Sequence, residues 1–153
     1  MVIAGGGTAG WMAAAALTKL LGKQLAVTLV ESDEIATIGV GEATIPTLQD
    51  FHQFLQINEA EFLKATNGTF KLGISFENWT EKNHQYFHPF GRFAVDFDYM
   101  PFSYFWNKHR AGGDKKRLQD YSAAWHLAKH NKFSQPSKDT KSLFSGFDYA
   151  YHF

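Results

Sequence analysis

A cluster of glycines near the first residue limits what this chain can fold into more than any other feature. In the stretch VIAGGGTAGWMAAAAL, the residues Gly5, Gly7 and Gly10 form a G-x-G-x-x-G pattern. Apolar residues precede the pattern and an alanine-rich segment follows it, which predicts a strand, a tight turn and a helix. In such a loop the first glycine lets the chain turn, the second lets the backbone approach a pyrophosphate, and the third lets helix and strand pack closely. Thr8 and Ala9 then begin the helix whose N-terminus faces the anion.

The segments after the glycines complete a βαβ unit. The residues from Thr8 to Leu21 predict a helix that ends at Gly22, and those from Gln24 to Val30 predict a buried parallel strand. Glu31 follows that strand, about 20 residues beyond the last glycine, where a carboxylate can accept hydrogen bonds from ribose hydroxyls. An acid there favours FAD or NAD over NADP. A solvated charge at a strand end is the alternative, but strand, loop, helix, strand and acid together favour dinucleotide binding.

Composition limits the function classes. The chain has 153 residues, of which 44% are hydrophobic, and this predicts one globular domain with a core. Fifteen basic residues balance fifteen acidic ones, so there is no net field to attract nucleic acid or an anionic membrane. The chain has no cysteine, which excludes disulfides and thiolate metal sites and fits a reducing compartment. The apolar run from Trp11 to Leu17 is too short to cross a bilayer. We expect a cytoplasmic protein with no nucleic-acid or membrane partner.

A second glycine-containing stretch, IGVGEATIP, follows the predicted βαβ unit. Its Gly39 and Gly41 permit unusual backbone conformations, and Pro46 suits the first turn of a helix. Further along, the hydrophobic pattern predicts helices over 46–56, 58–66, 101–111 and 118–132, a strand over 70–79, and an aromatic-rich loop after it. No repeat or low-complexity linker marks a domain boundary.

A pair of histidines is the one arrangement that suggests a metal. His126 and His130 are spaced i, i+4 and would share a helical face, as zinc ligands can. No third ligand and no H-E-x-x-H pattern accompany them. We therefore expect two surface histidines and no metal site.

Several stretches together resemble one family. GGGTAGWMAAAAL, ESDEIATIGVGEATIPTLQDF, NGTFKLGISFENW and HPFG are similar to the N-terminal part of the flavin-dependent tryptophan halogenases. The resemblance implies an α/β fold, namely the N-terminal part of a Rossmann-like FAD-binding module of the kind found in aromatic hydroxylases. It also implies that 1–153 is a partial FAD-binding halogenase domain that ends inside the FAD module. Only Met1 to Ala4 precede the glycine loop, which is short for a first strand, so we expect a chain truncated at both ends and inactive alone. GVGEATIP resembles the family's strap between the flavin and substrate sites, which adds Gly39, Gly41, Glu42 and Ala43 to the cofactor-binding residues.

The resemblance also implies a reaction. In that family reduced FAD, supplied by a separate flavin reductase, acts with O2 to oxidise chloride or bromide to hypohalous acid, and a lysine meets this oxidant near the substrate. The family's lysine falls on Lys71 in NGTFK, and the positions that sandwich the indole ring fall on His88 and Phe90. From the residues alone, Lys71 also fits a strand lysine with its amine in solvent. His88 and Phe90 equally fit a loop packed by its own aromatic rings.

The substrate and the reaction class stay open at this point. After Gly91 the chain resembles the tryptophan-specific members poorly, so free tryptophan, indole and an indole derivative are all candidates. A flavin-dependent aromatic hydroxylase, a monooxygenase that oxygenates its substrate directly, is the first alternative. A non-catalytic FAD-binding remnant is the second. Lys71 and GVGEATIP favour the halogenase.

Overall fold

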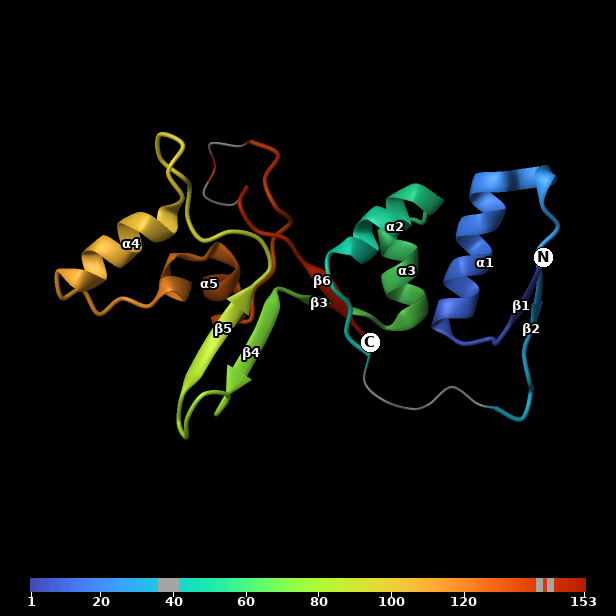
Figure 1. Ribbon diagram of the computed structural model, residues 1–153, viewed down its shortest axis with the longest axis horizontal. Coiled ribbons are helices and arrows are strands. Elements are labelled where there is room, and N and C mark those ends of the chain that lie inside the picture. Colours follow the sequence, from blue (N-terminus) through green and yellow to red (C-terminus); the bar gives the residue numbers. More distant parts are fainter. Residues whose placement is uncertain (36–41, 140–141, 143–144) are drawn as a thin grey trace.

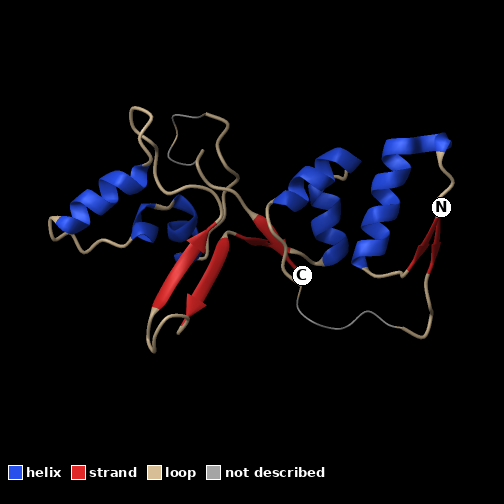
Figure 2. Ribbon diagram, viewed as in Figure 1, coloured by secondary structure: helices blue, strands red, loops and turns tan. Residues whose placement is uncertain are grey.

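The chain folds into three neighbouring groups of helices and strands (Figures 1 and 2). This computed structural model describes residues 1–35, 42–139, 142 and 145–153. In chain order the elements are β1 (Val2–Ala4), α1 (Thr8–Leu21), η1 (Gly22–Gln24), β2 (Thr28–Val30), α2 (Thr47–Leu55), α3 (Glu59–Thr66), β3 (Thr69–Lys71), β4 (Gly73–Glu77), β5 (Gln85–Pro89), α4 (Phe102–Ala111), η2 (Leu118–Tyr121), α5 (Ala123–Lys129) and β6 (Ala150–His152). In Figure 1 the first group, at the right, contains α1 and the strands β1 and β2. The central group contains two helices, α2 and α3, and the strand pair β3 and β6. The third group, at the left, contains the hairpin of β4 and β5 with the helices α4 and α5.

The first group confirms the predicted βαβ unit. β1 and β2 are parallel, with Val2 opposite Thr28 and Ala4 opposite Val30, and α1 connects them. The second strand is shorter than predicted, because η1 includes Gln24 and pairing with β1 begins only at Thr28. Gly22 closes α1 with a positive φ of 51°, and its N–H donates to the Thr18 carbonyl. The mixed α/β class predicted from the sequence is therefore correct.

The central group is built around β6. β6 pairs antiparallel with β3, so that Lys71 lies opposite Ala150, and Ala43 forms an antiparallel bridge to His152 on the other edge. Two segments far apart in the sequence therefore flank one strand. The main buried cluster lies at the same place and comprises Leu72, Ala124, Phe147, Tyr149 and Tyr151.

A carboxylate on α3 binds two tyrosines at β6. The hydroxyls of Tyr149 and Tyr151 both donate to Glu59 Oε1 at 2.7 Å, and Gln135 Nε2 donates to Glu59 Oε2 at 3.2 Å. Both tyrosines are buried. Burial, and then hydrogen bonding to Glu59, raises the pKa of each phenol, so both stay protonated and can donate. These bonds attach the first turn of α3 to β6.

The third group differs from the sequence prediction in three places. The strand expected over 70–79 is two strands, because β3 pairs with β6 whereas β4 pairs with β5, and buried Leu72 separates them. The expected aromatic-rich loop contains β5. The helix expected over 118–132 begins as the 3-10 helix η2, and α5 starts afresh where the Ser122 side chain accepts a hydrogen bond from Trp125 N at 3.3 Å.

We predict that Glu59→Ala lowers the free energy of unfolding of the full-length protein carrying this chain by about 2–4 kcal/mol, because two buried hydroxyls lose their acceptor. Denaturant titration measures the change. Glu59→Gln, which keeps an amide oxygen for the hydroxyls, should recover much of the loss. Glu61→Ala, an exposed acid on the same helix, is the matched control. Equal stability of the Glu59→Ala and Glu61→Ala proteins would contradict the role of this carboxylate.

Candidate functional site

The structure explains two of the three motif glycines and leaves an open space at the third. Gly5 has a φ of +121°, which side-chain-bearing residues rarely adopt, and a Cβ on Gly10 would collide with the Gly5 carbonyl oxygen. These two glycines serve the turn and the close packing of α1. Gly7 differs, because its φ is −75° and a Cβ there would meet nothing within 4 Å. Neither backbone nor packing requires glycine at this position, so the open space in front of Gly7 is available to a ligand.

The N-terminus of α1 has free hydrogen-bond donors at that space. Gly7 is the N-cap and provides no side-chain acceptor, and the first turn contains no acidic residue. The first amide with a backbone partner is that of Trp11, which donates to the Gly7 carbonyl at 3.1 Å. Within the described residues, the amides of Thr8, Ala9 and Gly10 have no acceptor. Unpaired amides at the positive end of a helix, next to an open space, fit a phosphate group such as the pyrophosphate of FAD.

Glu31 directly follows β2 and lies beside this loop. The Gly5 amide donates to the Val30 carbonyl at 2.8 Å, which brings the loop to the end of β2. Glu31 follows Val30, is exposed, and accepts a hydrogen bond at Oε2 from Trp11 Nε1 at 3.3 Å. Sequence reasoning did not identify Trp11 as a partner of this acid, although Trp11 directly follows the last motif glycine.

Lys71 lies within a second cluster, formed by residues from three parts of the sequence. Its Nζ donates to the Thr44 carbonyl at 3.2 Å and lies 5.3 Å from the centroid of the Phe90 ring. The strap residue Thr44 is fixed in turn to β6, because its amide donates to the Tyr151 carbonyl at 2.8 Å. Lys71 is half-buried. The lysine is therefore held by strap and ring and does not extend freely into solvent.

The other predicted site residues do not all lie beside the Lys71 amine. Glu42 pairs with Phe153 through two backbone hydrogen bonds of 2.9 and 3.0 Å, and Ala43 forms the bridge to β6, so this part of the strap adjoins the Lys71 cluster. Gly39 and Gly41 lie outside the described residues. His88 is exposed on β5, opposite Ile74 of β4.

Phe90 does not form a ring pair with His88 in the described structure. Phe90 is only 7% exposed, and its amide donates to the Leu72 carbonyl at 2.9 Å. Among the ring contacts between described residues, none joins His88 to Phe90. Their role in holding an indole ring stays a prediction.

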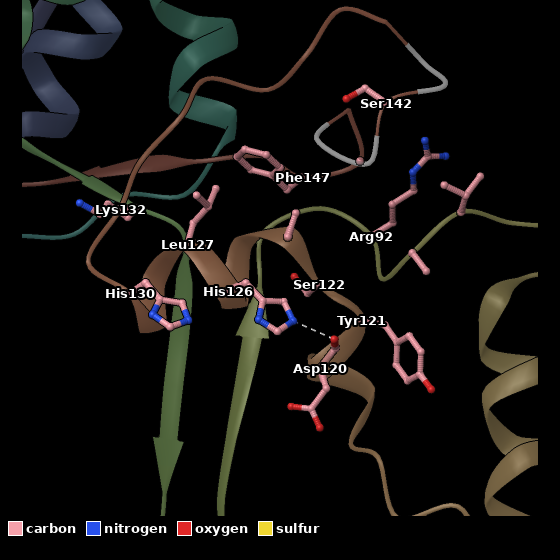
Figure 3. A pocket seen from close by; sticks show the side chains of 14 residues that line it. Arg92, Asp120, Tyr121, Ser122, His126, Leu127, His130, Lys132, Ser142 and Phe147 are labelled. Carbon is pink, nitrogen blue, oxygen red and sulfur yellow. Dashed lines mark hydrogen bonds between the residues drawn. The ribbon is translucent and has the colours of Figure 1, made fainter.

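A large cavity is lined by none of the predicted site residues. Its volume is about 530 Å³, and Figure 3 shows two of its lining residues, His126 on α5 and His130 directly after that helix. Phe147, which lines the cavity, forms an antiparallel bridge with Gly91, the residue after Phe90. Sequence reasoning missed the cavity, because its walls come from distant segments that carry no motif. The other lining residues are Arg92, Ala94, Val95, Asp120, Tyr121, Ser122, Ala123, Leu127, Lys132, Ser142, Gly146 and Phe147.

The two histidines are exposed, as predicted. Nε2 of His126 lies 2.9 Å from the Asp120 carbonyl oxygen. Among residues 1–35, 42–139, 142 and 145–153, no group of three or more His, Cys, Asp or Glu side chains is placed to hold a metal ion. Across the same residues, every helix is too short or too polar to pass through a bilayer.

Comparisons with known proteins agree on one family. The tryptophan halogenase family model matches residues 1–153. The 7-chloro-L-tryptophan 6-halogenase KtzR of Kutzneria sp. (strain 744) is 54% identical over 90 residues, which cover 59% of this chain and 17% of that protein. Xcc4156, a flavin-dependent halogenase from Xanthomonas campestris, superposes with a TM-score of 0.87 at 51% identity. BrvH, a flavin-dependent halogenase from Brevundimonas sp. BAL3, superposes with a TM-score of 0.86 at 42% identity.

The superpositions match nearly all of this chain to part of each halogenase. Each covers 99% of this chain but only 29% of Xcc4156 and 30% of BrvH, so the chain spans less than a third of the length of these halogenases. Across that span the identity is high and the folds agree, which confirms the Rossmann-like α/β class that the family resemblance implied. The chain belongs to the tryptophan halogenase family.

Proposed function

We propose that this chain provides the FAD-binding loop and the oxidant-directing lysine of a flavin-dependent halogenase that acts on tryptophan or another indole. The observation that carries the proposal is the convergence of Thr44, Lys71 and Phe90, which are distant in sequence and meet at one amine. A strand lysine with its amine in solvent would contact neither a backbone acceptor nor an aromatic ring. Membership of the tryptophan halogenase family supports the same function.

The first cluster would hold the cofactor. The amides of Thr8, Ala9 and Gly10, with the open space at Gly7, would bind the pyrophosphate, and Glu31 would accept hydrogen bonds from the adenosine ribose. The strap residues Glu42 and Ala43, together with Gly39 and Gly41, would belong to a segment that runs between the flavin site and the substrate site. Bound reduced FAD would supply, with O2, the oxidising power that converts chloride or bromide to hypohalous acid. A separate flavin reductase would deliver the reduced cofactor, and the cytoplasm is the proposed location.

Lys71 would direct the oxidant to the substrate. A protonated lysine amine has three N–H donors, and the Thr44 carbonyl accepts one of them, so two remain for a molecule of hypohalous acid. Because the amine is fixed to the backbone of the strap, it would present those donors from a constant position. Constant orientation of a reactive group supplies much of the rate advantage of an enclosed site.

His88 would contribute to substrate binding. Its ring is exposed on β5 and is therefore accessible to the flat face of an indole, whereas Phe90 lies buried beside Lys71. Stacking holds an aromatic ring by dispersion and by quadrupole geometry, and leaves the ring edge open to attack. Free tryptophan, indole and an indole derivative all satisfy this arrangement.

We predict that Gly7→Val and Gly7→Ser weaken FAD binding to the full-length protein by roughly tenfold or more, equivalent to ~1.4 kcal/mol. Either side chain would enter the space in front of the α1 amides, while the protein itself has room for it. Serine is also a favourable N-cap, so Gly7→Ser should leave the melting temperature unchanged or higher. Calorimetry measures both FAD affinities. Unchanged affinity in both variants would show that this loop is only a turn.

We predict that Lys71→Ala abolishes halogenation in the full-length protein while reduced flavin continues to be oxidised by O2. The oxidant would form at the flavin, so removal of a group near the substrate stops its use rather than its production. Halogenated product by mass spectrometry and oxygen uptake are measured together, with the exposed Lys64→Ala as the matched control. Halogenation near the parent rate would exclude Lys71 from the reaction. A parent that yields only hydroxylated product would favour the aromatic hydroxylase, and a parent that binds FAD without turnover would favour the remnant.

We predict a different defect for His88→Ala, namely a KM for the indole substrate that rises roughly three- to tenfold with little change in kcat, because stacking stabilises binding. Steady-state kinetics with a saturating flavin supply measures the two constants. His109→Ala, an exposed histidine on α4, serves as the control. A loss of kcat with unchanged KM would show that His88 takes part in the chemical step.

A further inference from the structure

Gly6 is a glycine that the G-x-G-x-x-G pattern does not require. Its φ is not in the left-handed region, so other residues could adopt its backbone conformation. A Cβ at this position would collide with the side chain of Glu31, including its carboxylate oxygen Oε2 and its Cδ. The space over Gly6 is therefore occupied by Glu31, and glycine is needed here because of that acid.

Trp11 approaches the same carboxylate oxygen from the helix. Its Nε1 donates to Glu31 Oε2 at 3.3 Å, and an indole N–H can only donate. The side chain of Trp11 is 55% exposed, so it contributes little to the packing of α1. Oε2 of Glu31 thus lies against Gly6 and accepts the hydrogen bond from Trp11. The other carboxylate oxygen has no donor among the described residues.

A glutamate at a strand end would otherwise be free to rotate. Glu31 is exposed, and its side chain would have to be ordered when its carboxylate binds a ligand. With Oε2 placed against Gly6 and bonded to Trp11, the carboxylate is ordered beforehand and faces the loop in which the open space at Gly7 lies. Ordering a binding group in advance lowers the cost of binding.

We propose that Gly6 and Trp11 are positioning residues that hold the Glu31 carboxylate ready for the adenosine ribose of FAD. This inference rests on the proposed function, because it assumes that the glycine loop binds FAD. Gly6 provides the space in which the carboxylate lies, and Trp11 provides the donor that fixes it there. Neither residue touches the cofactor in this role, since each acts through Glu31.

The test measures the Kd of FAD in the full-length protein for Trp11→Phe and Gly6→Ala, alone and combined with Glu31→Ala. Trp11→Phe keeps an aromatic ring but removes the indole N–H that bonds to Glu31, and we expect a Kd roughly three- to tenfold higher. Gly6→Ala should raise the Kd at least as much, because its Cβ displaces the carboxylate. In the Glu31→Ala background both substitutions should lose their effect on the Kd. Trp79→Phe, at another exposed tryptophan, is the matched control and should change nothing.

The double variants separate positioning from a general structural role. If Trp11→Phe or Gly6→Ala weakens FAD binding equally with and without Glu31, the residue does not act through that acid and the inference is overturned. A Kd within twofold of the parent for both single variants, when Glu31→Ala itself weakens binding, also overturns it and leaves the proposed function intact. If Glu31→Ala and Gly7→Val both leave the Kd unchanged, the proposed flavin role of the loop fails, and the inference fails with it.

Discussion

The hydrogen bonds from Tyr149 and Tyr151 to Glu59 hold the strand on which the rest of the central group depends. β6 pairs with β3 on one edge and with the strap residues 42–44 on the other, and neither edge partner touches the other through backbone pairing. The carboxylate on α3 therefore fixes a strand that three segments share. Bringing such distant residues together has a cost in chain entropy, and two charge-assisted hydrogen bonds from buried phenols help to offset it.

The parts of the fold that the sequence predicts well are those determined by neighbouring residues. α1 follows from its alanines and its terminal glycine, and α3 follows the N-cap Asn58, whose side chain accepts a hydrogen bond from Glu61 N at 3.1 Å. β3 and β6 contain three residues each, too few to show a period, and their pairing joins distant positions. The break between η2 and α5 was missed because the apolar pattern continues across Ser122, whose capping bond is visible only in the structure.

The same distinction applies to the candidate site. The glycine pattern, Glu31 and the NGTFK lysine could be located from the sequence, because a motif fixes their positions. Their partners could not. A backbone carbonyl such as that of Thr44 leaves no signature of residue type, and Trp11 would serve equally as an apolar helix residue. The four loop glycines look alike in sequence, yet Gly5 is required by its backbone angle, Gly10 by helix packing and Gly6 by the side chain of Glu31.

Thr44 is a single residue that connects Lys71 to β6. Its hydroxyl accepts a hydrogen bond from Tyr151 N at 2.9 Å and donates to the Tyr151 carbonyl at 3.1 Å, while its own carbonyl accepts from Lys71 Nζ. Hydrogen bonds therefore run without interruption from Glu59 through Tyr151 and Thr44 to the amine. Lys71 also belongs to β3, which pairs with β6. Lys71 is therefore connected to β6 by two routes, one through Thr44 and one through its own strand. Because both routes pass through β6, the position of the lysine is a property of the assembled sheet rather than of the short strand that carries it.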